Sequence, residues 1–391
     1  MSTEQLDVTE EQVLYFRALR GGLAGRGAAT PEAAASSLLG GQAQLEAPAL
    51  KALSQRTANR PTAEALKTAL WQERTLIRTW GQRDTVHLYD AQDWPLIAAA
   101  RSEWVYSGRR GGMADEDDLQ RAREYIASLD TPFTRKDLYH VVSQTLHDKV
   151  APVAEKANKT PTHFAAGRLI WQLSAKGDVC TVFKQGSEQA YAYREHWLPS
   201  LAWPSQTDPV EAAASLAKRY LSTYGPATIK DIAHFFGTRI KEVKTWMARL
   251  HEQDALLSVS CGERSDLWLC REDVETLCEL PPKSAKKWPV RLLPSYDSML
   301  MGHADKNWAV PQQDERKQIW GKAARVSAVV LARGRIVATW KHKSTKKTFT
   351  LQLTLLSGWN TRAHKAAVLR EAKDIAEHLG TPDAKIVLKM A

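Results

Sequence analysis

The sequence has few cysteines and no long apolar segment. Its four cysteines show no C-x-x-C spacing and stand beside no histidine cluster, so neither a disulfide framework nor a zinc site is expected. No apolar run approaches the length of about 18 residues that a membrane-spanning helix needs. The acidic N-terminal stretch also lacks the basic and apolar regions of a signal peptide. We therefore expect a cytoplasmic protein that has no membrane partner.

The common catalytic signatures are missing as well. The chain contains no H-E-x-x-H motif, no phosphate-binding Walker loop, no G-x-S-x-G motif and no dinucleotide fingerprint. The isolated histidines His87, His234 and His303 are more often structural than catalytic in such a setting. Asp84 and Asp297 are expected to be cap or turn residues. The sequence therefore predicts no metal site and no organic cofactor.

Positive charge is what the chain has in excess. Its 54 basic residues outnumber its 44 acidic residues, which gives a formal charge of +10 over 391 residues. An excess of this size favours a polyanionic partner such as nucleic acid, although a basic protein that is merely soluble is the alternative.

Cap residues and β-rich runs predict a repeated order of helices followed by a hairpin. Thr9 and Gln12 have the spacing of a capping box, and Thr30 precedes a proline that suits the first turn of a second helix ending near Gly40. A third helix over residues 62–72 and a hairpin over residues 75–88 complete a winged-helix unit. Helices and a hairpin recur over residues 134–194, and again over residues 209–270.

The expected fold is therefore α+β, with about three tandem winged-helix units and a C-terminal antiparallel β-rich region. The predicted boundaries are 1–130, 131–205, 206–280 and 281–391. The last region carries three β-rich runs and a final helix over residues 362–379, which indicates a small antiparallel sheet or part of a barrel.

Two basic features are candidates for DNA contact. The predicted recognition helix of the third unit, residues 239–250, carries Arg239, Lys241, Lys244 and Arg249, and such a helix can enter a DNA groove. The second feature is a set of six basic residues without an acidic one, which we expect on a hairpin with Trp340: Arg333, Arg335, Lys341, Lys343, Lys346 and Lys347. Such a hairpin can touch the backbone or enter a minor groove. A solvated surface is the alternative for both features.

Five stretches, taken together, resemble a known family. They are Gln42-Ala43-Gln44, the runs at residues 74–88 and 218–231, Leu292-Leu293-Pro294-Ser295-Tyr296-Asp297, and Arg335-Ile336-Val337-Ala338-Thr339-Trp340. In this order and spacing they are similar to the signature blocks of the AlkZ/YcaQ family of DNA glycosylases. The resemblance covers nearly the whole chain.

The resemblance implies a C-shaped arrangement of winged-helix domains around a β-rich core, with a basic channel for double-stranded DNA. It implies excision of alkylated purines such as N7-alkylguanine and, in some members, unhooking of interstrand crosslinks. The family's site is a Q-x-Q or Q-x-D motif, so Gln42 and Gln44 are the catalytic candidates and place the chain with the Q-x-Q branch. A monomer associated with the nucleoid is the expected form.

Two amides can suffice for this chemistry. Alkylation at N7 gives guanine a positive charge, so the base leaves as a neutral molecule without the general acid that ordinary glycosidases need. Gln42 and Gln44 can then position water below C1′ and offer partial negative charge to the developing sugar cation. Both must face one site, which requires an extended backbone with Ala43 packed away from it. No lysine is clearly placed for lyase chemistry, so we expect an abasic product. A non-catalytic winged-helix regulator and an RNA-binding module are the alternatives.

Overall fold

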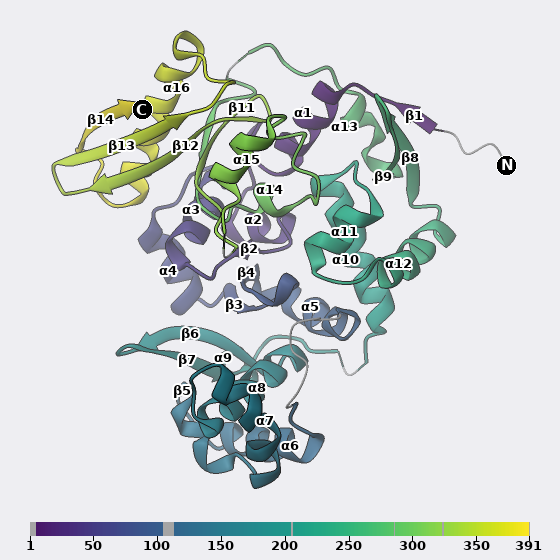
Figure 1. Ribbon diagram of the computed structural model, residues 1–391, viewed down its shortest axis with the longest axis vertical. Coiled ribbons are helices and arrows are strands. Elements are labelled where there is room, and N and C mark those ends of the chain that lie inside the picture. Colours follow the sequence, from purple (N-terminus) through teal and green to yellow (C-terminus); the bar gives the residue numbers. More distant parts are fainter. Residues whose placement is uncertain (1–4, 105–112, 205, 285, 323, 391) are drawn as a thin grey trace.

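The computed structural model describes residues 5–104, 113–204, 206–284, 286–322 and 324–390. These residues form a mixed α+β fold with three β-sheets of three, five and six strands (Figure 1), which confirms the predicted fold class. Within the described ranges, no helix combines the length and the apolar character that a membrane crossing requires.

The N-terminal part contains the predicted helices and two that were not predicted, α3 and α5. Helix α1 begins after the capping box of Thr9 and Gln12, and α2 after the N-cap Thr30, as predicted. Helix α3 follows the Q-x-Q stretch directly, and Pro48 lies in its first turn, where a proline leaves no intrahelical hydrogen bond unmade. The elements are β1 (Gln5–Asp7), α1 (Glu10–Arg20), α2 (Pro31–Ser37), β2 (Gly41–Gln42), α3 (Glu46–Arg56), α4 (Ala63–Trp71), β3 (Leu76–Trp80), β4 (Val86–Asp90) and α5 (Trp94–Ala100).

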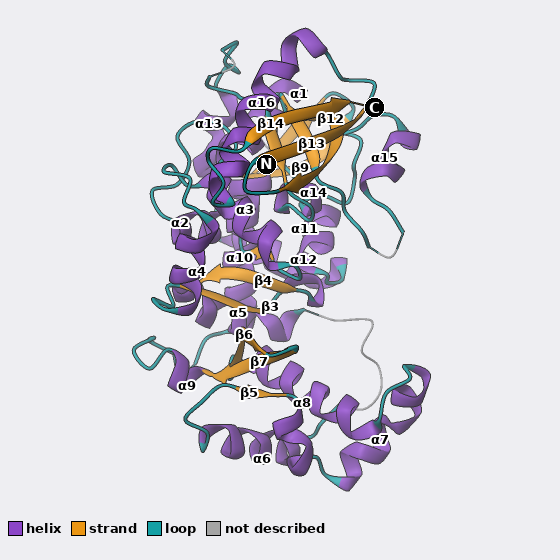
Figure 2. Ribbon diagram, turned by 90° about the vertical axis from the view of Figure 1, so that its left-hand side faces the viewer, coloured by secondary structure: helices purple, strands orange, loops and turns teal. Residues whose placement is uncertain are grey.

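The six-stranded sheet joins the first two helix-and-hairpin units. Its strand order is β2-β4-β3-β6-β7-β5, and the pair Arg78 and Thr181 connects β3 to β6 across the two hairpins. Figure 2 shows β4, β3, β6, β7 and β5 following one another along the molecule, with α6 and α7 beyond β5. The Thr134 hydroxyl donates to the Asp137 carboxylate at the start of a 3₁₀ helix (Lys136–Val141), where no α-helix forms. The elements are α6 (Glu116–Ala127), β5 (Phe133–Thr134), α7 (Gln144–Lys156), α8 (Pro161–Lys176), β6 (Val179–Gln185), β7 (Glu188–Tyr193) and α9 (Arg194–Trp197).

The third unit has the predicted winged-helix order. Thr228 and Asp231 form a capping box at the start of α11, and Gly237 takes the left-handed conformation that ends this helix. Strand β1 adds to the wing by pairing in parallel with β8, so residues 5–7 extend the sheet of this unit. The elements are α10 (Pro209–Tyr224), α11 (Ile229–Phe236), α12 (Ile240–Glu252), β8 (Leu256–Cys261), β9 (Arg264–Cys270) and α13 (Val274–Cys278).

The C-terminal region is an open sheet with the order β10-β11-β12-β13-β14. Its first four strands are antiparallel, as predicted, but β13 and β14 are parallel because α16 carries the chain back between them. Neither β10 nor β14 was predicted. The elements are β10 (Arg291–Leu293), α14 (Ser298–Met301), α15 (Gln313–Ile319), β11 (Val329–Ala332), β12 (Arg335–Ser344), β13 (Thr348–Leu355), α16 (Thr361–His378) and β14 (Lys385–Met390).

The largest hydrophobic core lies where the third unit meets the six-stranded sheet. Trp94 of α5 packs there with aromatic side chains of α10, α11 and α12, among them Tyr220, Phe235 and Trp246, and all four are almost completely buried. Aromatic side chains dominate the energetics of such a core. The same core contains Leu39, which lies shortly before β2.

Candidate active site

The Q-x-Q motif begins on the edge strand β2 of the six-stranded sheet, which ends at Gln42. Gly41 and Gln42 pair with Leu88 and His87 of β4, and the amide of Ala43 continues this pairing by donating to the Val86 carbonyl at 2.7 Å. Ala43 is fully buried in the hydrophobic core. Ala43 packs inward as expected, but the extended strand expected to carry both glutamines includes only Gln42, and the chain bends at Gln44.

The loop before β2 is fixed by side chains from three other parts of the chain. The carbonyls of residues 38, 39 and 40 accept, in turn, from the Tyr224 hydroxyl of α10 at 2.9 Å, the Gln82 amide at 2.8 Å and the Ser298 hydroxyl of α14 at 3.3 Å. Backbone carbonyls that are satisfied in this way hold their loop in one conformation. The approach to the motif is thus set by the first unit, the third unit and the C-terminal region together.

Gln42 is buried, and Arg83 sets the orientation of its amide. One guanidinium nitrogen of Arg83 donates to Gln42 Oε1 at 3.3 Å, and the other donates to the Phe235 carbonyl at 2.5 Å. Because a guanidinium can only donate, the Gln42 carbonyl oxygen must be the atom that faces it. Burial lowers the pKa of Arg83 to about 10, so the side chain stays charged at neutral pH.

His87 completes this hydrogen-bond chain as a neutral acceptor. Its Nδ1 lies 2.9 Å from the Thr85 carbonyl, and its Nε2 lies 3.3 Å from the same Arg83 nitrogen. The carbonyl can only accept and the guanidinium only donate, so Nδ1 carries the proton. Burial, together with the charge of Arg83, holds the pKa of His87 well below its usual range. The histidine is structural, as the sequence suggested.

Gln44 is exposed, and the backbone of β4 fixes its amide. Gln44 Oε1 accepts from the Val86 amide at 3.3 Å, which takes the place of a backbone partner beyond the end of β2. The Gln44 side chain is therefore anchored on β4, whereas the Gln42 side chain is held by Arg83 of the preceding turn. Each carbonyl oxygen keeps a second lone pair, and in the described part of the chain neither Nε2 group has a hydrogen-bond partner.

The turn that carries Arg83 also contacts the third unit. Arg83 and Asp84 both have φ of 55° within the 3₁₀ turn Gln82–Asp84, and a Cβ on Gly237 would lie 2.7 Å from Arg83 Cα. The turn between α11 and α12 therefore packs directly on the Arg83 backbone. Asp84 lies in this turn, as predicted, and its carboxylate accepts from the Trp171 indole of α8.

A buried ion pair joins α3 to the turn before α14. Arg56 donates to both oxygens of Asp297, at 2.9 and 2.7 Å, and the two side chains are at most 1% exposed. Asp297 also accepts from the Met299 amide at the start of α14, so it is the cap residue that the sequence predicted. Because Asp297 is held by this pair, the position of the adjacent Ser298 is also restrained, and the Ser298 hydroxyl donates to the Gly40 carbonyl.

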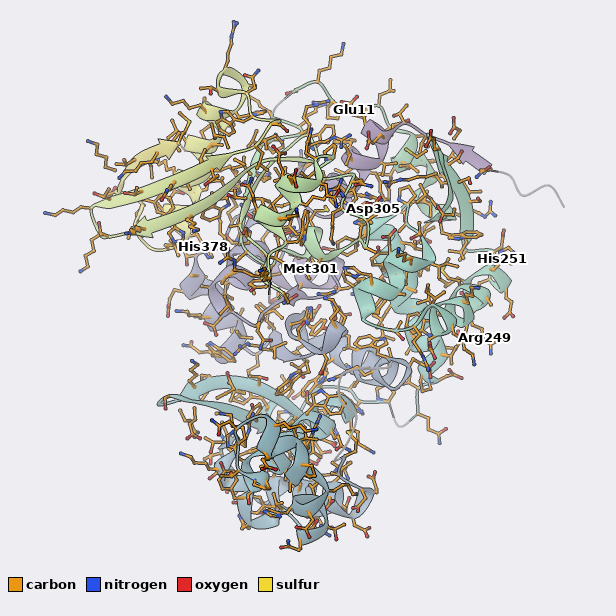
Figure 3. The ribbon with its side chains drawn as sticks, viewed as in Figure 1. Glu11, Arg249, His251, Met301, Asp305 and His378 are labelled. Atoms are coloured by element: carbon orange, nitrogen blue, oxygen red, sulfur yellow. The ribbon has the colours of Figure 1, made fainter. Side chains whose placement is uncertain are left out.

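The basic residues predicted to contact DNA are not all equally available. On α12, Lys241 and Lys244 are exposed, whereas Arg239 pairs with Glu242. Arg249, on the same helix, pairs with Glu211 and Glu252 and lies at the outer edge of the molecule (Figure 3).

The six basic residues of the C-terminal region lie on two turns and not on one hairpin. Arg333 and Arg335 flank the β11–β12 turn and pair with Glu11 and Glu10 of α1. Four exposed lysines lie toward the opposite end of β12, a strand of ten residues: Lys341, Lys343, Lys346 and Lys347. The expected single basic hairpin is therefore corrected to a cluster of four lysines. Trp340 is buried and donates to two backbone carbonyls.

Sequence reasoning assigned no role to several residues that shape the site. Gln82, Arg83 and Tyr224 stand in stretches that carried the family resemblance, and Ser298 directly follows another. Their side chains converge on the loop and strand of the Q-x-Q motif. Their presence in those stretches was the available signal, but only the fold shows what they contact.

Comparisons with known proteins agree with this geometry. A family model described as DNA glycosylase AlkZ-like matches residues 35–378. The interstrand DNA cross-link repair glycosylase of Streptomyces sahachiroi is 24% identical over 279 residues, which are 68% of this chain and 70% of that protein. The solved structure of Streptomyces sahachiroi DNA glycosylase AlkZ has a TM-score of 0.79 at 22% identity and covers 99% of this chain and 100% of its own. Because the family model spans most of the chain, the chain belongs to the AlkZ-like family of DNA glycosylases.

Proposed function

We propose that this glycosylase hydrolyses the N-glycosidic bond of cationic alkylpurines, such as N7-alkylguanine, in double-stranded DNA. In this proposal Gln42 and Gln44 act at the reacting centre. The observation that supports it best is that a protein donor orients each of the two amide carbonyl oxygens, Arg83 that of Gln42 and the Val86 amide that of Gln44. Family membership supports the reaction class.

The chemistry needs only positioning and electrostatics. A base alkylated at N7 is already positively charged, so it departs as a neutral molecule and needs no protonation by the enzyme. The remaining lone pairs of Gln42 and Gln44 can accept from a water molecule and orient it toward C1′. Their carbonyl dipoles also favour the positive charge that develops on the sugar. An unmodified base is a poor leaving group and is spared.

Arg83 is a positioning residue in this mechanism. It holds Gln42 by its carbonyl oxygen, while His87 and the Phe235 carbonyl hold Arg83 in turn. A side chain that is fixed before substrate binds loses little freedom in the transition state. The rotamer of Gln42 is therefore set without the help of DNA.

The proposal also includes the residues that contact DNA and the range of substrates. We assign phosphate contacts to the exposed lysines of α12 and to the cluster of four lysines at the end of β12 and in the turn that follows it. We assign less to Arg239, Arg333 and Arg335, because carboxylates already pair with these arginines. The name of the Streptomyces sahachiroi relative supports extending the substrates to interstrand crosslinks. The protein would act as a monomer on the DNA of the nucleoid, and it would leave an abasic site without cutting the strand.

Base release from defined duplexes tests this function. Purified protein is incubated with DNA carrying one N7-methylguanine, with and without chelator, and free base and abasic sites are measured. Release in both conditions, without strand cleavage or a borohydride-trapped complex, is the expected result. Binding without release would instead favour a non-catalytic winged-helix regulator, and a trapped complex would contradict the assignment of a monofunctional enzyme.

A further inference from the structure

A cavity beside Gln44 has no role in the mechanism above. It measures about 590 Å³ and lies between the start of α3, the turn before α14, strand β12 and the end of α16. Its α3 wall begins at Leu45, the residue that follows Gln44, and Leu45 is 54% exposed. Figure 3 labels His378, which lines the cavity between the C-terminal sheet and α3. The size falls within the range of about 300–1,000 Å³ that is typical of small-molecule sites.

The aromatic walls of the cavity are held in place. Tyr296 has a φ of 59°, which L-residues rarely adopt, and it directly precedes Asp297, whose carboxylate is bound by Arg56. The Trp340 indole donates to the Leu293 carbonyl at 2.9 Å and to the Val329 carbonyl at 3.1 Å. Both rings therefore line a cavity that exists before any ligand binds.

Two buried polar side chains also line the cavity. Lys51 is 5% exposed and His378 is 4% exposed. The Lys51 ammonium has no hydrogen-bond partner within the described ranges, and burial lowers its pKa to about 8. His378 Nδ1 donates to the Pro61 carbonyl at 3.0 Å, and burial lowers the pKa of this histidine to about 4. A donor and a neutral acceptor are thus available to a ligand in a largely apolar space.

The charges around the cavity restrict what it can hold. Lys51 is joined in the lining by Lys341 and Arg325, so an N7-alkylated purine ring, which is itself a cation, would meet repulsion there. An uncharged substituent suits the apolar and aromatic walls and loses contact with water on entry. The substituent on N7, rather than the purine, is the better occupant.

We propose that this cavity receives the uncharged, largely apolar substituent on N7 of a bulky alkylpurine while Gln42 and Gln44 act at the sugar. This inference rests on the proposed function and extends it from the base to the group attached to it. It makes the cavity a determinant of substrate specificity, which favours bulky aromatic adducts over N7-methylguanine.

The test compares two adducts in three variants. Duplexes carry either N7-benzylguanine or N7-methylguanine, and single-turnover release is measured for both. Ala47→Trp and Leu379→Trp fill the cavity from opposite walls, and Ala366→Trp, at an exposed position of α16 outside the lining, is the matched control. We expect both cavity variants to lower the benzyl-to-methyl rate ratio by about tenfold or more, the effect of losing burial of an aromatic ring, with no change in the control.

Other outcomes would overturn the proposal. Equal losses for both adducts would mean that the cavity holds the purine or only supports the glutamines, and an unchanged ratio would mean that it holds no part of the adduct. If the wild-type protein releases neither base, the proposed function fails by itself. Affinity for duplexes with the hydrolysis-resistant 2′-fluoro forms of the two adducts then decides. A selective loss of benzyl affinity in the cavity variants supports the inference, and an unchanged selectivity refutes it.

Discussion

Replacing Gly40 by alanine should damage the site more than the same change at Gly41. Gly40 has a φ of 85°, and a Cβ there would lie 2.3 Å from the Tyr89 ring. The left-handed backbone costs an L-residue about 1–2 kcal/mol, and forcing a methyl group into a packed ring costs about 1–3 kcal/mol. We therefore expect Gly40→Ala to lose about 2–5 kcal/mol of stability, or to displace the loop and the Q-x-Q strand with it.

Gly41→Ala is the matched control, because a Cβ at Gly41 would have no atom within 4 Å. Urea unfolding measures the stability of each variant, and single-turnover release of N7-methylguanine measures the effect on the site. Gly40→Ala should be impaired in at least one measurement, and Gly41→Ala should stay close to the wild type in stability. Equal stability and equal release in the two variants would refute the role given to this loop.

Three further perturbations follow from the structure. Arg56→Ala leaves the buried Asp297 carboxylate unpaired and should lower the free energy of unfolding in urea by about 3–5 kcal/mol. A loss below about 1 kcal/mol would contradict the role given to this ion pair. His234→Gln should flatten the pH dependence of stability. Burial lowers the pKa of His234 from 6.5 to about 4. Between these two pH values the unfolded chain is protonated at His234 and the folded chain is not, so wild-type stability falls as the pH drops through this window. An unchanged slope would contradict this. Lys346→Ala and Lys347→Ala should each reduce the salt slope of DNA binding by about one, and an unchanged slope would remove them from the interface.

Local sequence signals predicted some of the individual elements. Capping residues located α1 and α2, because a cap depends on neighbours a few residues away. Helix α3 escaped prediction because Leu45 at its N-cap makes no side-chain hydrogen bond, so no capping residue marks its start. Strand β14 escaped because its partner β13 lies across α16, and such pairing leaves no local pattern.

Contacts between distant residues could not be predicted in the same way. Residues 42 and 44 were chosen through the family resemblance, and the extended backbone was a condition derived from the chemistry. The partners that fix them, such as Arg83 to Gln42 and Ser298 to Gly40, join positions 41 and 258 residues apart. The basic set of six failed as one hairpin because the length of β12 separates its two ends.

The most direct test of the account is single-turnover release of N7-methylguanine by Gln44→Ala, measured together with the affinity for the same duplex. Gln44 is exposed and contributes little to the core, so this variant should fold and bind DNA nearly as the wild type does. Losing one group that positions water and stabilises charge should slow release by about a hundredfold or more. Release at the wild-type rate, or a loss of affinity as large as the loss of rate, would contradict the assignment of Gln44 to the reacting centre.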